Sequence, residues 1–424
     1  MKQPSASWQL LRTLLRRLGW MLLLGVLLAG CEREPATLPE QPSAETVATS
    51  PRPSSSSIER TANLRDFTLD YTHQIPVNLA EIQTAVLVLQ DAIRTLLATP
   101  GNDSLDAARD AWLQAHGAYE RGALDRYFAN LVLPQSQALE LFQLRYRINQ
   151  WPILPGYLDA VEGYADSGIV NDITVDLTPE NLRQQHGAFD LSEATLGFHV
   201  IEFLLWGSNS DGNSPRGFED FVQIRESESA DSDDGIAAAQ LPANRRRALL
   251  SLTSDQLVLD VEAMQTLWRN YSVDVQAAIP GMDAPVLLDR LMRAMTEMLS
   301  EELLVRSLYP MLNGDFEDSI QSPYSHSTQI AVSAQLSGLD RLLLEHQSAA
   351  GLNLDALINT LSANFTDFFY QNFDASKECL VLLYNEIEIP ENIASAQKTE
   401  FAIVECINLV TNMIDHLDQV RTSL

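Results

Sequence analysis

The sequence predicts an all-α protein made of two up-and-down helical bundles. Through most of the chain, apolar residues recur at alternating spacings of three and four, which is the period of an amphipathic helix. Alternation of period two, typical of a strand, is limited to one short stretch. The chain has 424 residues, of which 46% are hydrophobic, and this length exceeds the usual size of one core. We therefore expect two domains.

The charge of the chain is strongly acidic. It carries 57 acidic and 28 basic residues, a formal net charge of -29. Such a balance disfavours nucleic acid and anionic membrane surfaces as partners, and it favours cations or basic polypeptides. A role of the acidity in keeping the protein soluble fits equally well.

Residues 1–30 have the pattern of a secretion signal. Arg12, Arg16 and Arg17 precede an apolar run that is too short to span a bilayer. The run ends in Leu-Ala-Gly before Cys31, which resembles the lipoprotein box of bacteria. This resemblance implies cleavage before Cys31 and attachment of acyl chains to it. An ordinary signal peptide with an incidental cysteine is the alternative.

Lipidation of Cys31 implies a protein that is anchored to a membrane and faces the periplasm. Glu32 follows the cysteine, where an aspartate would indicate the inner membrane by resemblance to enterobacterial sorting, so the outer membrane is favoured. Residues 31–61 are rich in proline and serine and contain few large apolar side chains. We expect them to form a flexible tether.

The first bundle is expected over residues 62–215. Apolar spacing predicts a helix over residues 79–96, and a second helix that is capped by Asp103 or Ser104. A third helix is expected over residues 135–148, before a proline that disfavours the helical conformation. The inner face of the second helix is predicted to consist of Leu105, Ala108, Trp112, Ala115 and Tyr119.

The end of this half contains the most informative stretch. Residues 168–178 alternate with a period of two and are predicted to form a short strand pair or a loop. A helix is then expected to begin at Asp190, with Glu193 at the capping-box spacing, and to end at Gly207. Its last part, residues 197–207, is apolar on all sides, which predicts burial at the centre of a bundle.

His199 and Glu202 are the polar exceptions in this apolar stretch. They stand at i and i+3, so their side chains share one face of the helix. Burying an imidazole and a carboxylate is costly unless each finds a partner or a cation. One interpretation is a metal site, because these ligand types suit iron or zinc and such pairs build metal sites in helix bundles. The other is a hydrogen-bonded polar pair without further function.

Residues 216–243 interrupt the helical pattern with a run of acidic residues and serines, and are predicted to be a solvated, mobile insertion. The second bundle is expected over residues 244–424. Its helices are predicted at residues 242–278, 285–311, 327–346, 354–372 and 393–420. The buried side of the last helix is predicted to consist of Phe401, Val404, Ile407, Ile414, Leu417 and Val420.

Two cysteines remain if Cys31 is lipidated. Cys379 and Cys406 would lie in an oxidising compartment, which allows a disulfide between them. Two separately buried thiols fit the sequence comparably well, because cysteine is among the most buried residue types.

Gly197, His199 and Glu202 form a Gly-x-His-x-x-Glu motif that is followed by Phe-Leu-Leu-Trp-Gly. This stretch resembles the signature of the imelysin-like family of bacterial envelope proteins. Members include proteins described as metallopeptidases, iron-regulated proteins and relatives of a periplasmic component of ferrous-iron uptake. The resemblance implies two related helical bundles, a bound divalent or ferric metal ion, with iron favoured and zinc the alternative, and iron transporter components as partners. Weaker resemblances occur at residues 108–112, 148–152, 301–306, 324–328 and 337–339.

The resemblance also implies that residues 324–326 fold back towards the motif. Family members usually read Phe-Ser-Asp-Asn-Thr where this chain has Tyr324, Ser325 and His326 followed by Ser-Thr, so a site built here is altered. These three residues and Arg306 are additional candidate site residues around the motif. For His326, a surface loop histidine is the alternative interpretation.

A second pair, His116 and Glu120, stands at i and i+4 and could face the same core. Trp112 and Tyr119 beside them are expected to be ordinary packing residues.

Three functions are consistent with these observations. The favoured one is a lipid-anchored, periplasm-facing protein that binds a metal through His199 and Glu202 for iron uptake. A metallopeptidase is the second, although the chain has neither a His-Glu-x-x-His motif nor its inverse, and no catalytic residue can be named. The third is a binding or scaffold lipoprotein in which the His–Glu pair is structural and the function lies in a cleft between the halves.

Overall fold

The computed structural model describes residues 55–209, 214–226, 237–360, 362, 364–388 and 396–422. The signal segment, Cys31 and most of the expected tether lie outside these residues, as does the centre of the expected acidic insertion. The chain from Ser54 to Leu424 forms one compact unit. In the described part of the chain the regular structure is helical, with two isolated bridges and no strand. The all-α prediction is therefore confirmed.

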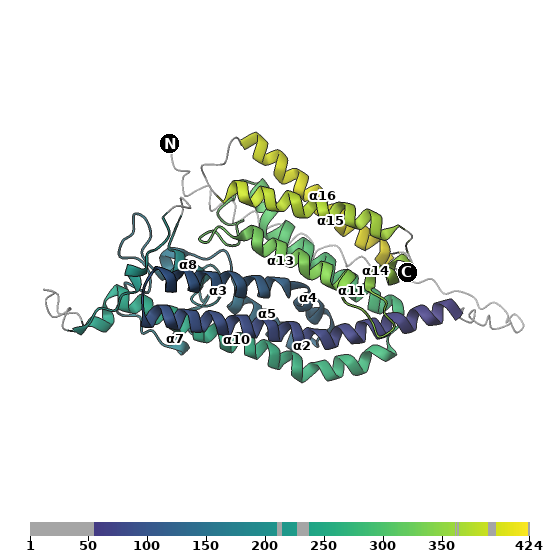
Figure 1. Cartoon of the computed structure of the whole chain (residues 1–424), viewed down its shortest axis with the longest axis horizontal. Helices are drawn as coiled ribbons and strands as arrows, with labels where there is room; N and C mark the ends of the chain where they lie inside the picture. Colours follow the sequence, from purple (N-terminus) through teal and green to yellow (C-terminus); the bar gives the residue numbers. More distant parts are fainter. Residues whose placement is uncertain are drawn as a thin grey trace, which may run out of the picture. The chain divides into compact units, whose positions relative to one another are not determined.

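Helix α2 (Ser55–Ala98) is the central helix on which the first group of helices packs, and it is drawn in purple in Figure 1. It begins inside the stretch expected to be tether and contains Pro76. Helices α3 (Asn102–Arg121) and α10 (Pro242–Ala278) both pack along it. The predicted inner face of α3 is buried throughout. The expected cap at Asp103 or Ser104 is wrong, because α3 begins at Asn102 and its N-cap residue is Gly101.

Helix α10 follows the expected insertion at residues 216–243, yet it packs on helices that precede this insertion. Besides α2, it contacts α5 (Gln135–Asn149) and α8 (Phe198–Trp206). Two buried arginines fix its first turn: Arg246 forms an ion pair with Asp159, and Arg245 donates to the carbonyls of Ile169 and Val170. Helices from before and after residues 216–243 therefore pack together in the first group.

The arginine contacts also explain the stretch at residues 168–178. Arg245 donates from one guanidinium nitrogen to the carbonyls of Ile169, Asp172 and Val175. These three carbonyls all accept from one side chain. In a strand they would instead accept from the backbone of a neighbouring strand. Of the two predicted alternatives, the loop is confirmed.

The second group contains four long helical segments in the described part of the chain, of which α16 (Ala396–Thr422) is the last. Helix α11 (Ala284–Met298), π-helix η4 (Leu299–Leu308) and α12 (Tyr309–Leu312) are continuous and match the helix predicted at residues 285–311. Helix α13 (Thr328–Asp340) continues into π-helix η5 (Arg341–Glu345). The helix predicted at residues 354–372 is two helices, α14 (Leu354–Asn359) and α15 (Phe365–Ile387). Shorter elements are α4 (Ala123–Val132), α6 (Pro155–Leu158), α7 (Pro179–Gln185), η1 (Phe218–Phe221), η2 (Ala238–Gln240) and η3 (Ile279–Gly281).

Helix α16 lies beside α15, at the top of Figure 1. Its predicted buried side is wrong at the start of the helix, where Phe401 is 71% exposed and Val404 is also exposed. The buried residues keep the predicted spacing of three and four, but near the start of the helix they lie on a neighbouring face. The apolar period predicts that one face of the helix is buried, and it does not fix which residue that face begins with. The buried residues are Ile403, Cys406, Val410, Met413, Leu417 and Val420.

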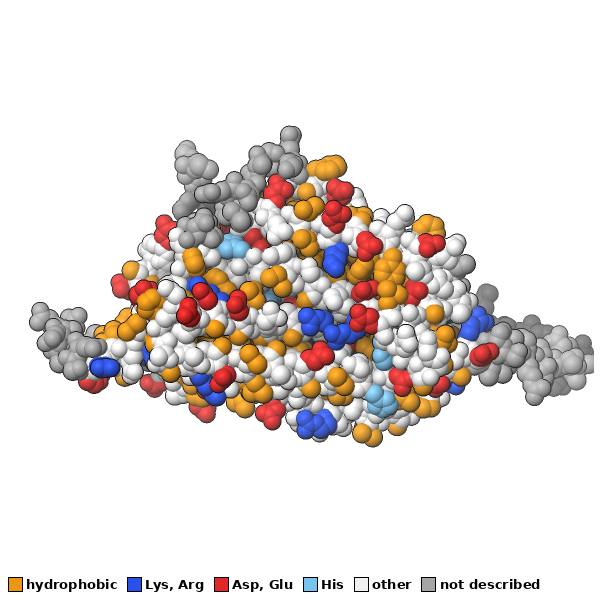
Figure 2. All heavy atoms as spheres, in the orientation of Figure 1, with side chains coloured by type: hydrophobic (Ala, Val, Ile, Leu, Met, Phe, Trp, Pro, Cys, Tyr) orange, Lys and Arg blue, Asp and Glu red, His pale blue; other side chains and the backbone are white. Residues whose placement is uncertain are grey.

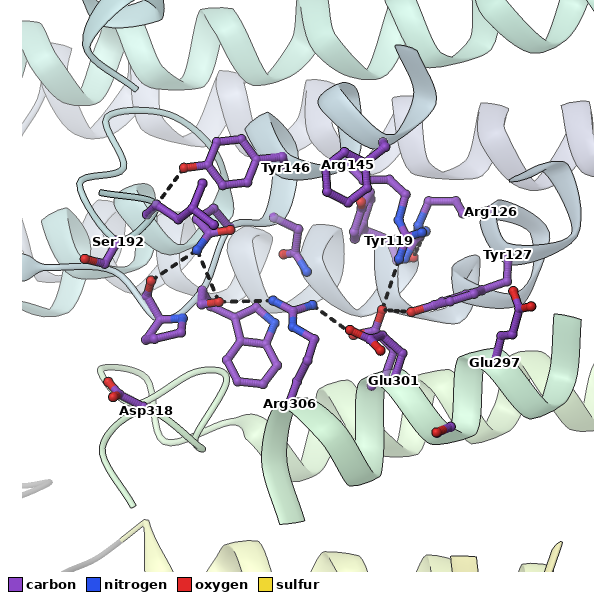
Figure 3. Close-up of a pocket in the computed structure, with 18 of the residues that line it drawn as sticks. Tyr119, Arg126, Tyr127, Arg145, Tyr146, Ser192, Glu297, Glu301, Arg306 and Asp318 are labelled. Atoms are coloured by element: carbon purple, nitrogen blue, oxygen red, sulfur yellow. Dashed lines mark hydrogen bonds and ion pairs between the residues drawn. The ribbon is translucent and has the colours of Figure 1, made fainter. Parts of the chain in front are cut away.

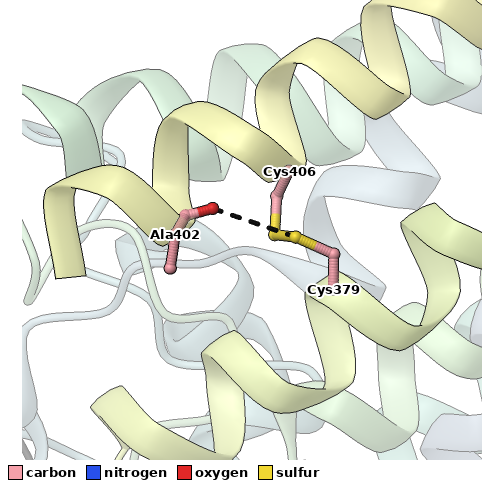
Figure 4. Close-up of a disulfide and its surroundings, with 3 residues drawn as sticks. All are labelled: Cys379, Ala402 and Cys406. Carbon is pink, nitrogen blue, oxygen red and sulfur yellow. Dashed lines mark hydrogen bonds between the residues drawn. A yellow bond between two sulfur atoms is a disulfide. The ribbon is translucent and has the colours of Figure 1, made fainter. Parts of the chain in front are cut away.

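A disulfide between Cys379 and Cys406 joins α15 to α16 (Figure 4). Of the two arrangements left open by the sequence, the bridged one is present. The link connects helices whose buried faces both belong to the main hydrophobic core.

The two groups of helices meet along α3 and α13, and along α4 and α11. Gly338 permits the first contact, because a Cβ at this position would lie 2.1 Å from the carbonyl oxygen of Arg121. Acidic side chains are spread over the face seen in Figure 2, with fewer basic ones between them. No helix in the described part of the chain is long and apolar enough to cross a membrane.

Candidate functional site

The motif helix α8 is shorter than predicted and is wholly buried. All nine of its residues, from Phe198 to Trp206, are buried, as its apolar sequence indicates. It begins at Phe198 instead of Asp190, because Asp190 caps a turn by accepting bonds from the backbone and hydroxyl of Ser192. The predicted capping box is therefore wrong, while the predicted end at Gly207 is confirmed.

Gly197 immediately precedes α8 and has a positive φ of 96°. A Cβ at this position would lie 2.5 Å from the carbonyl oxygen of Arg147 and 2.6 Å from that of Ile148. Only glycine avoids both this overlap and the strain of the backbone conformation. The motif glycine thus lets the start of α8 lie directly against the end of α5.

His199 and Glu202 contact each other within the core. Nδ1 of His199 lies 2.8 Å from Oε2 of Glu202, and both side chains are at most 1% exposed. Because a carboxylate can only accept, the imidazole donates its Nδ1 proton in this bond. The proton position leaves a lone pair on Nε2.

The second carboxylate oxygen of Glu202 is also fully used. Oε1 accepts hydrogen bonds from the backbone nitrogens of Tyr324 and Ser325, at 3.1 and 2.9 Å, and from the Ser325 hydroxyl at 2.8 Å. Residues 324–325 thus lie at the motif, as the family resemblance implied. The contacts show Glu202 as a side chain that fixes His199 and the 324–325 backbone, with no oxygen left unpaired.

His326 lies close by but does not contact the His–Glu pair. It has a positive φ of 52°, and its Nε2 lies 2.9 Å from the carbonyl oxygen of Asn209. Arg306 is farther along the junction of the two groups of helices, where it pairs with Glu302 at 3.0 Å and donates to the carbonyl oxygen of Trp151. Of the four additional candidates, Tyr324 and Ser325 therefore contact Glu202, and His326 and Arg306 have other partners.

Burial sets the protonation of His199. The pKa of this imidazole is lowered by desolvation, and the hydrogen bond and charge of Glu202 oppose this shift only in part. A neutral ring at neutral pH follows. Nε2 of His199 has no hydrogen-bond partner in the described part of the chain, although it is buried. An unpaired buried acceptor is costly, so this nitrogen calls for a ligand or a special role.

His116 and Glu120 form a second buried pair beside the first, on α3. Nε2 of His116 lies 3.4 Å from Glu120 Oε1, which is within ion-pair distance but too poorly directed for a hydrogen bond. The His116 and His199 rings meet edge to face with centroids 5.0 Å apart. The i, i+4 spacing predicted that this pair could face the same core as His199, and the ring contact agrees with that prediction.

Glu120 accepts from residues of both halves of the chain. Asn149, Gln321 and Gln335 donate to its two oxygens at 2.7 to 2.8 Å. Burial opposes ionisation, but the contact with His116, the charge of Arg126 and the hydrogen bond from Gln335 hold the pKa of Glu120 well below its usual range. The site therefore has two buried carboxylates, each bonded to the half of the chain on the other side of the junction.

A cavity of about 590 Å³ lies at the motif. His199, Tyr324 and His326 line it, together with Glu388 at the end of α15. Glu388 accepts a bond of 2.8 Å from the backbone nitrogen of Thr328. Desolvation and, to a smaller extent, the charge of Glu202 raise the pKa of Glu388 to about 8. The wall of the cavity thus carries a carboxyl group that holds its proton at neutral pH.

The donor set fits a metal ion only in part. His199 offers one neutral nitrogen held in orientation by a carboxylate, which is how metal-binding histidines are usually supported. However, no group of three or more His, Cys, Asp or Glu side chains that could hold a metal is gathered in the described ranges. The chain itself thus offers an anchoring ligand rather than a closed coordination shell.

The fold and this site define an all-helical protein with a buried His–carboxylate pair at the junction of two bundles. The imelysin family model (Peptidase_M75) matches residues 78–400, and the chain belongs to this family. This finding confirms the resemblance seen in the motif.

The fold is also that of solved crystal structures. One is of a protein named as an iron-regulated protein A precursor from Parabacteroides distasonis ATCC 8503, with a TM-score of 0.59 and 14% identity over 86% of this chain and 95% of that one. Another is of an imelysin-like protein from Psychrobacter arcticum 273-4, with a TM-score of 0.51 and 14% identity over 85% and 93% of the two chains. No curated protein matches the sequence.

Proposed function

We propose that this protein is a lipid-anchored envelope protein that binds a metal ion beside His199 and takes part in iron uptake. The observation that carries the proposal is the unpaired Nε2 of His199, a buried nitrogen on a residue that lines a cavity. Its neutral ring and its bond to Glu202 leave the lone pair ready to bind a cation.

The sequence suggested His199 and Glu202 as two metal ligands, and the contacts favour different roles for them. His199 is the direct ligand, and Glu202 is the residue that orients it, because all its contacts are already made. The other coordination positions are filled by solvent or by groups that arrive with the ion in the cavity. Iron is favoured over zinc on the name of the Parabacteroides relative, which describes that protein as iron-regulated.

Elemental analysis and calorimetric titration with Fe(II), Fe(III), Zn(II) and Cu(II) test the proposal. We expect the wild type to bind one of these ions stoichiometrically and the His199→Ala variant to lose this binding. His73→Ala is the matched control, because His73 is exposed on α2 and should leave binding unchanged. No binding by the wild type, with His199→Ala merely less stable, would show that the pair is structural.

Peptide hydrolysis is not included in the proposal. A metal that activates water for hydrolysis is normally held by three protein ligands, and the described residues do not gather such a set. Cleavage of an unfolded protein by the metal-loaded wild type, absent from His199→Ala, would establish the peptidase alternative instead.

The envelope location rests on the signal pattern before Cys31 and on the outer-membrane preference of Glu32. Fractionation of cells that express the wild type and a Cys31→Ser variant tests it. We expect the wild type in outer membranes and the variant released from them. Iron transporter components are the partners that this role proposes, and cross-linking from the anchored protein would identify them.

A further inference from the structure

A second and larger groove lies along the junction of the two halves, with a cavity volume of about 1140 Å³. Its walls come from α3, α4 and α5 on one side and from η4 on the other (Figure 3). Trp151, Pro152 and Asp318 line both this groove and the cavity at His199, so the two are neighbours. Its polar residues are not used by the proposed metal site.

Three arginines line the groove, and each guanidinium lies over an aromatic ring. The distances from the guanidinium carbon to the ring centroid are 3.7, 4.5 and 4.1 Å. Such stacking holds a guanidinium in place while leaving its edge free to bind a planar anion. The pairs are Arg126 on Tyr119, Arg145 on Tyr127, and Arg306 on Trp151.

One buried carboxylate serves two of these arginines. Glu302, on η4, accepts from Arg145 at 3.2 Å and from Arg306 at 3.0 Å. It also accepts the hydroxyl proton of Tyr127 at 2.7 Å. Glu302 is therefore fully engaged by these three side chains, and it does not pair with the third arginine.

Arg126 is that third arginine, and it is 4% exposed. Its Nη1 donates to the carbonyl oxygen of Tyr119, whereas its Nε is buried without a partner. Within the described part of the chain, no carboxylate forms an ion pair with it at 4 Å or less. The acidic side chains next to it in sequence are engaged elsewhere: Asp125 by Tyr71 and Asn78, and Glu120 by three amides.

The charge of Arg126 interacts favourably with the buried carboxylates of Glu120 and Asp125, although neither forms a direct ion pair with it. Its buried Nε still lacks a hydrogen-bond partner, which is unfavourable, and an anion that enters the groove would pair with this guanidinium directly. The rim restricts which anion this can be. Five carboxylates besides Glu302 line the groove, and their charge disfavours most strongly a ligand with several negative charges. They are Asp190, Glu297, Glu301, Asp318 and Asp418. A single planar carboxylate matches one free guanidinium in both charge and shape.

We propose that this groove binds a small organic carboxylate, with its carboxylate group on Arg126 and its body against the aromatic faces beside it. The site does not use His199 or Glu202, although its groove shares part of its lining with the cavity at the motif, and it needs no metal. It would give the protein a second, anionic ligand at the same junction.

Titration of the full-length chain, purified in mild detergent and free of added metal, tests this proposal with benzoate, succinate and inorganic phosphate as probes. We expect saturable binding of benzoate, weaker binding of the doubly charged succinate, and still weaker binding of phosphate. Arg126→Gln should reduce the affinity for benzoate at least tenfold. Arg94→Gln, at an exposed arginine on α2 that pairs with Asp255, is the control and should change nothing.

A second variant covers the case in which Arg126→Gln does not fold. Ser300, on η4, is partly exposed and lines the groove, so Ser300→Trp should block the groove while leaving Arg126 in place. We expect it to lose benzoate binding as well. The proposal is overturned if the wild type binds neither carboxylate at millimolar concentration, if phosphate binds more tightly than benzoate, or if Ser300→Trp binds benzoate like the wild type.

Discussion

The hydroxyl of Ser325 lies 2.8 Å from Oε1 of Glu202, and this bond joins the motif helix to the second half of the chain. Two backbone amides reinforce it at the same oxygen, and the opposite oxygen binds His199. The carboxylate therefore couples the position of an imidazole to the junction of the two bundles. Its replacement should change metal binding more than folding.

Glu202→Gln tests this coupling. The glutamine oxygen is expected to stay with the three donors at residues 324–325, which turns its NH2 group towards Nδ1 of His199. The imidazole must then accept at Nδ1 and carry its proton on Nε2, so its lone pair no longer faces a cation. We expect metal affinity to fall by about 10- to 100-fold, the usual effect of losing a supporting carboxylate.

Calorimetry gives the affinity of Glu202→Gln, and nitrogen NMR of the ring gives the tautomer. Ser325→Ala is the comparison, because it removes one of three donors and leaves the His199 bond intact. It should keep the Nδ1–H tautomer and most of the affinity. Unchanged metal binding in Glu202→Gln would contradict the role of Glu202 as the residue that orients His199.

Gly197→Ala should destabilise the protein strongly. The new Cβ would overlap the carbonyl oxygens of Arg147 and Ile148, and the positive φ at this position is strained for alanine. We expect a loss of roughly 2–4 kcal/mol in the free energy of unfolding, the range of combined overpacking and backbone strain. Denaturant titration measures it.

The control for Gly197→Ala is Gly281→Ala. Gly281 is exposed in η3, and a Cβ there would meet no heavy atom within 4 Å. Its free energy of unfolding should change by less than about 0.5 kcal/mol. Equal effects of the two substitutions would mean that the close approach of α8 to α5 carries no stability.

Periodicity in the sequence predicted the helices well where it continued over many residues. The range of α10 and the buried face of α3 agree with the structure because their apolar stripes are long and regular. The helix starts were less predictable, since Asp190 has the spacing of a cap but uses its side chain in a turn at Ser192. Local patterns cannot distinguish these two uses of one aspartate.

Only the part of the site that lies within one helix could be predicted from the sequence. The spacing of His199 and Glu202 placed them on one face, and they do contact each other. Their partners come from distant parts of the chain, and residues 324–325 were found only by family resemblance. Glu302 and Arg126 were missed. Glu302 binds arginines of both halves, and the Nε of Arg126 has no partner, and both facts depend on how the two halves pack.

Glu388→Gln should change how stability depends on pH. Burial raises the pKa of Glu388 to about 8, so the folded protein holds this proton at pH values where the unfolded chain has released it. The stability from this proton is therefore fully present below the unfolded pKa and is lost as pH rises through about 8. Between these limits the slope is about -1.4 kcal/mol per pH unit.

The glutamine keeps an oxygen for the backbone nitrogen of Thr328 but has no proton to lose. Unfolding free energies between pH 5 and pH 9, measured by denaturant titration, should thus show a flatter profile for Glu388→Gln than for the wild type. Glu378→Gln, at an exposed position on the same helix, should keep the wild-type slope. Parallel profiles for all three proteins would show that Glu388 is ionised in the fold.

The disulfide between Cys379 and Cys406 should supply a large share of the stability of the last two helices. It closes a segment with a sequence separation of 27 residues, for which the chain-entropy model gives about 3–4 kcal/mol. A Cys379→Ala, Cys406→Ala double variant should lose that amount in denaturant unfolding, and reductant should then have no further effect on it. Reductant should lower the free energy of unfolding of the wild type towards that of the variant, because it opens the same disulfide.

Hydrogen exchange gives a second measurement. The α2–α3 contact lies in the other group of helices, so its exchange rate should change only through global unfolding. If the variant is as stable as the oxidised wild type, the packing of α15 on α16 holds these helices without the covalent bond.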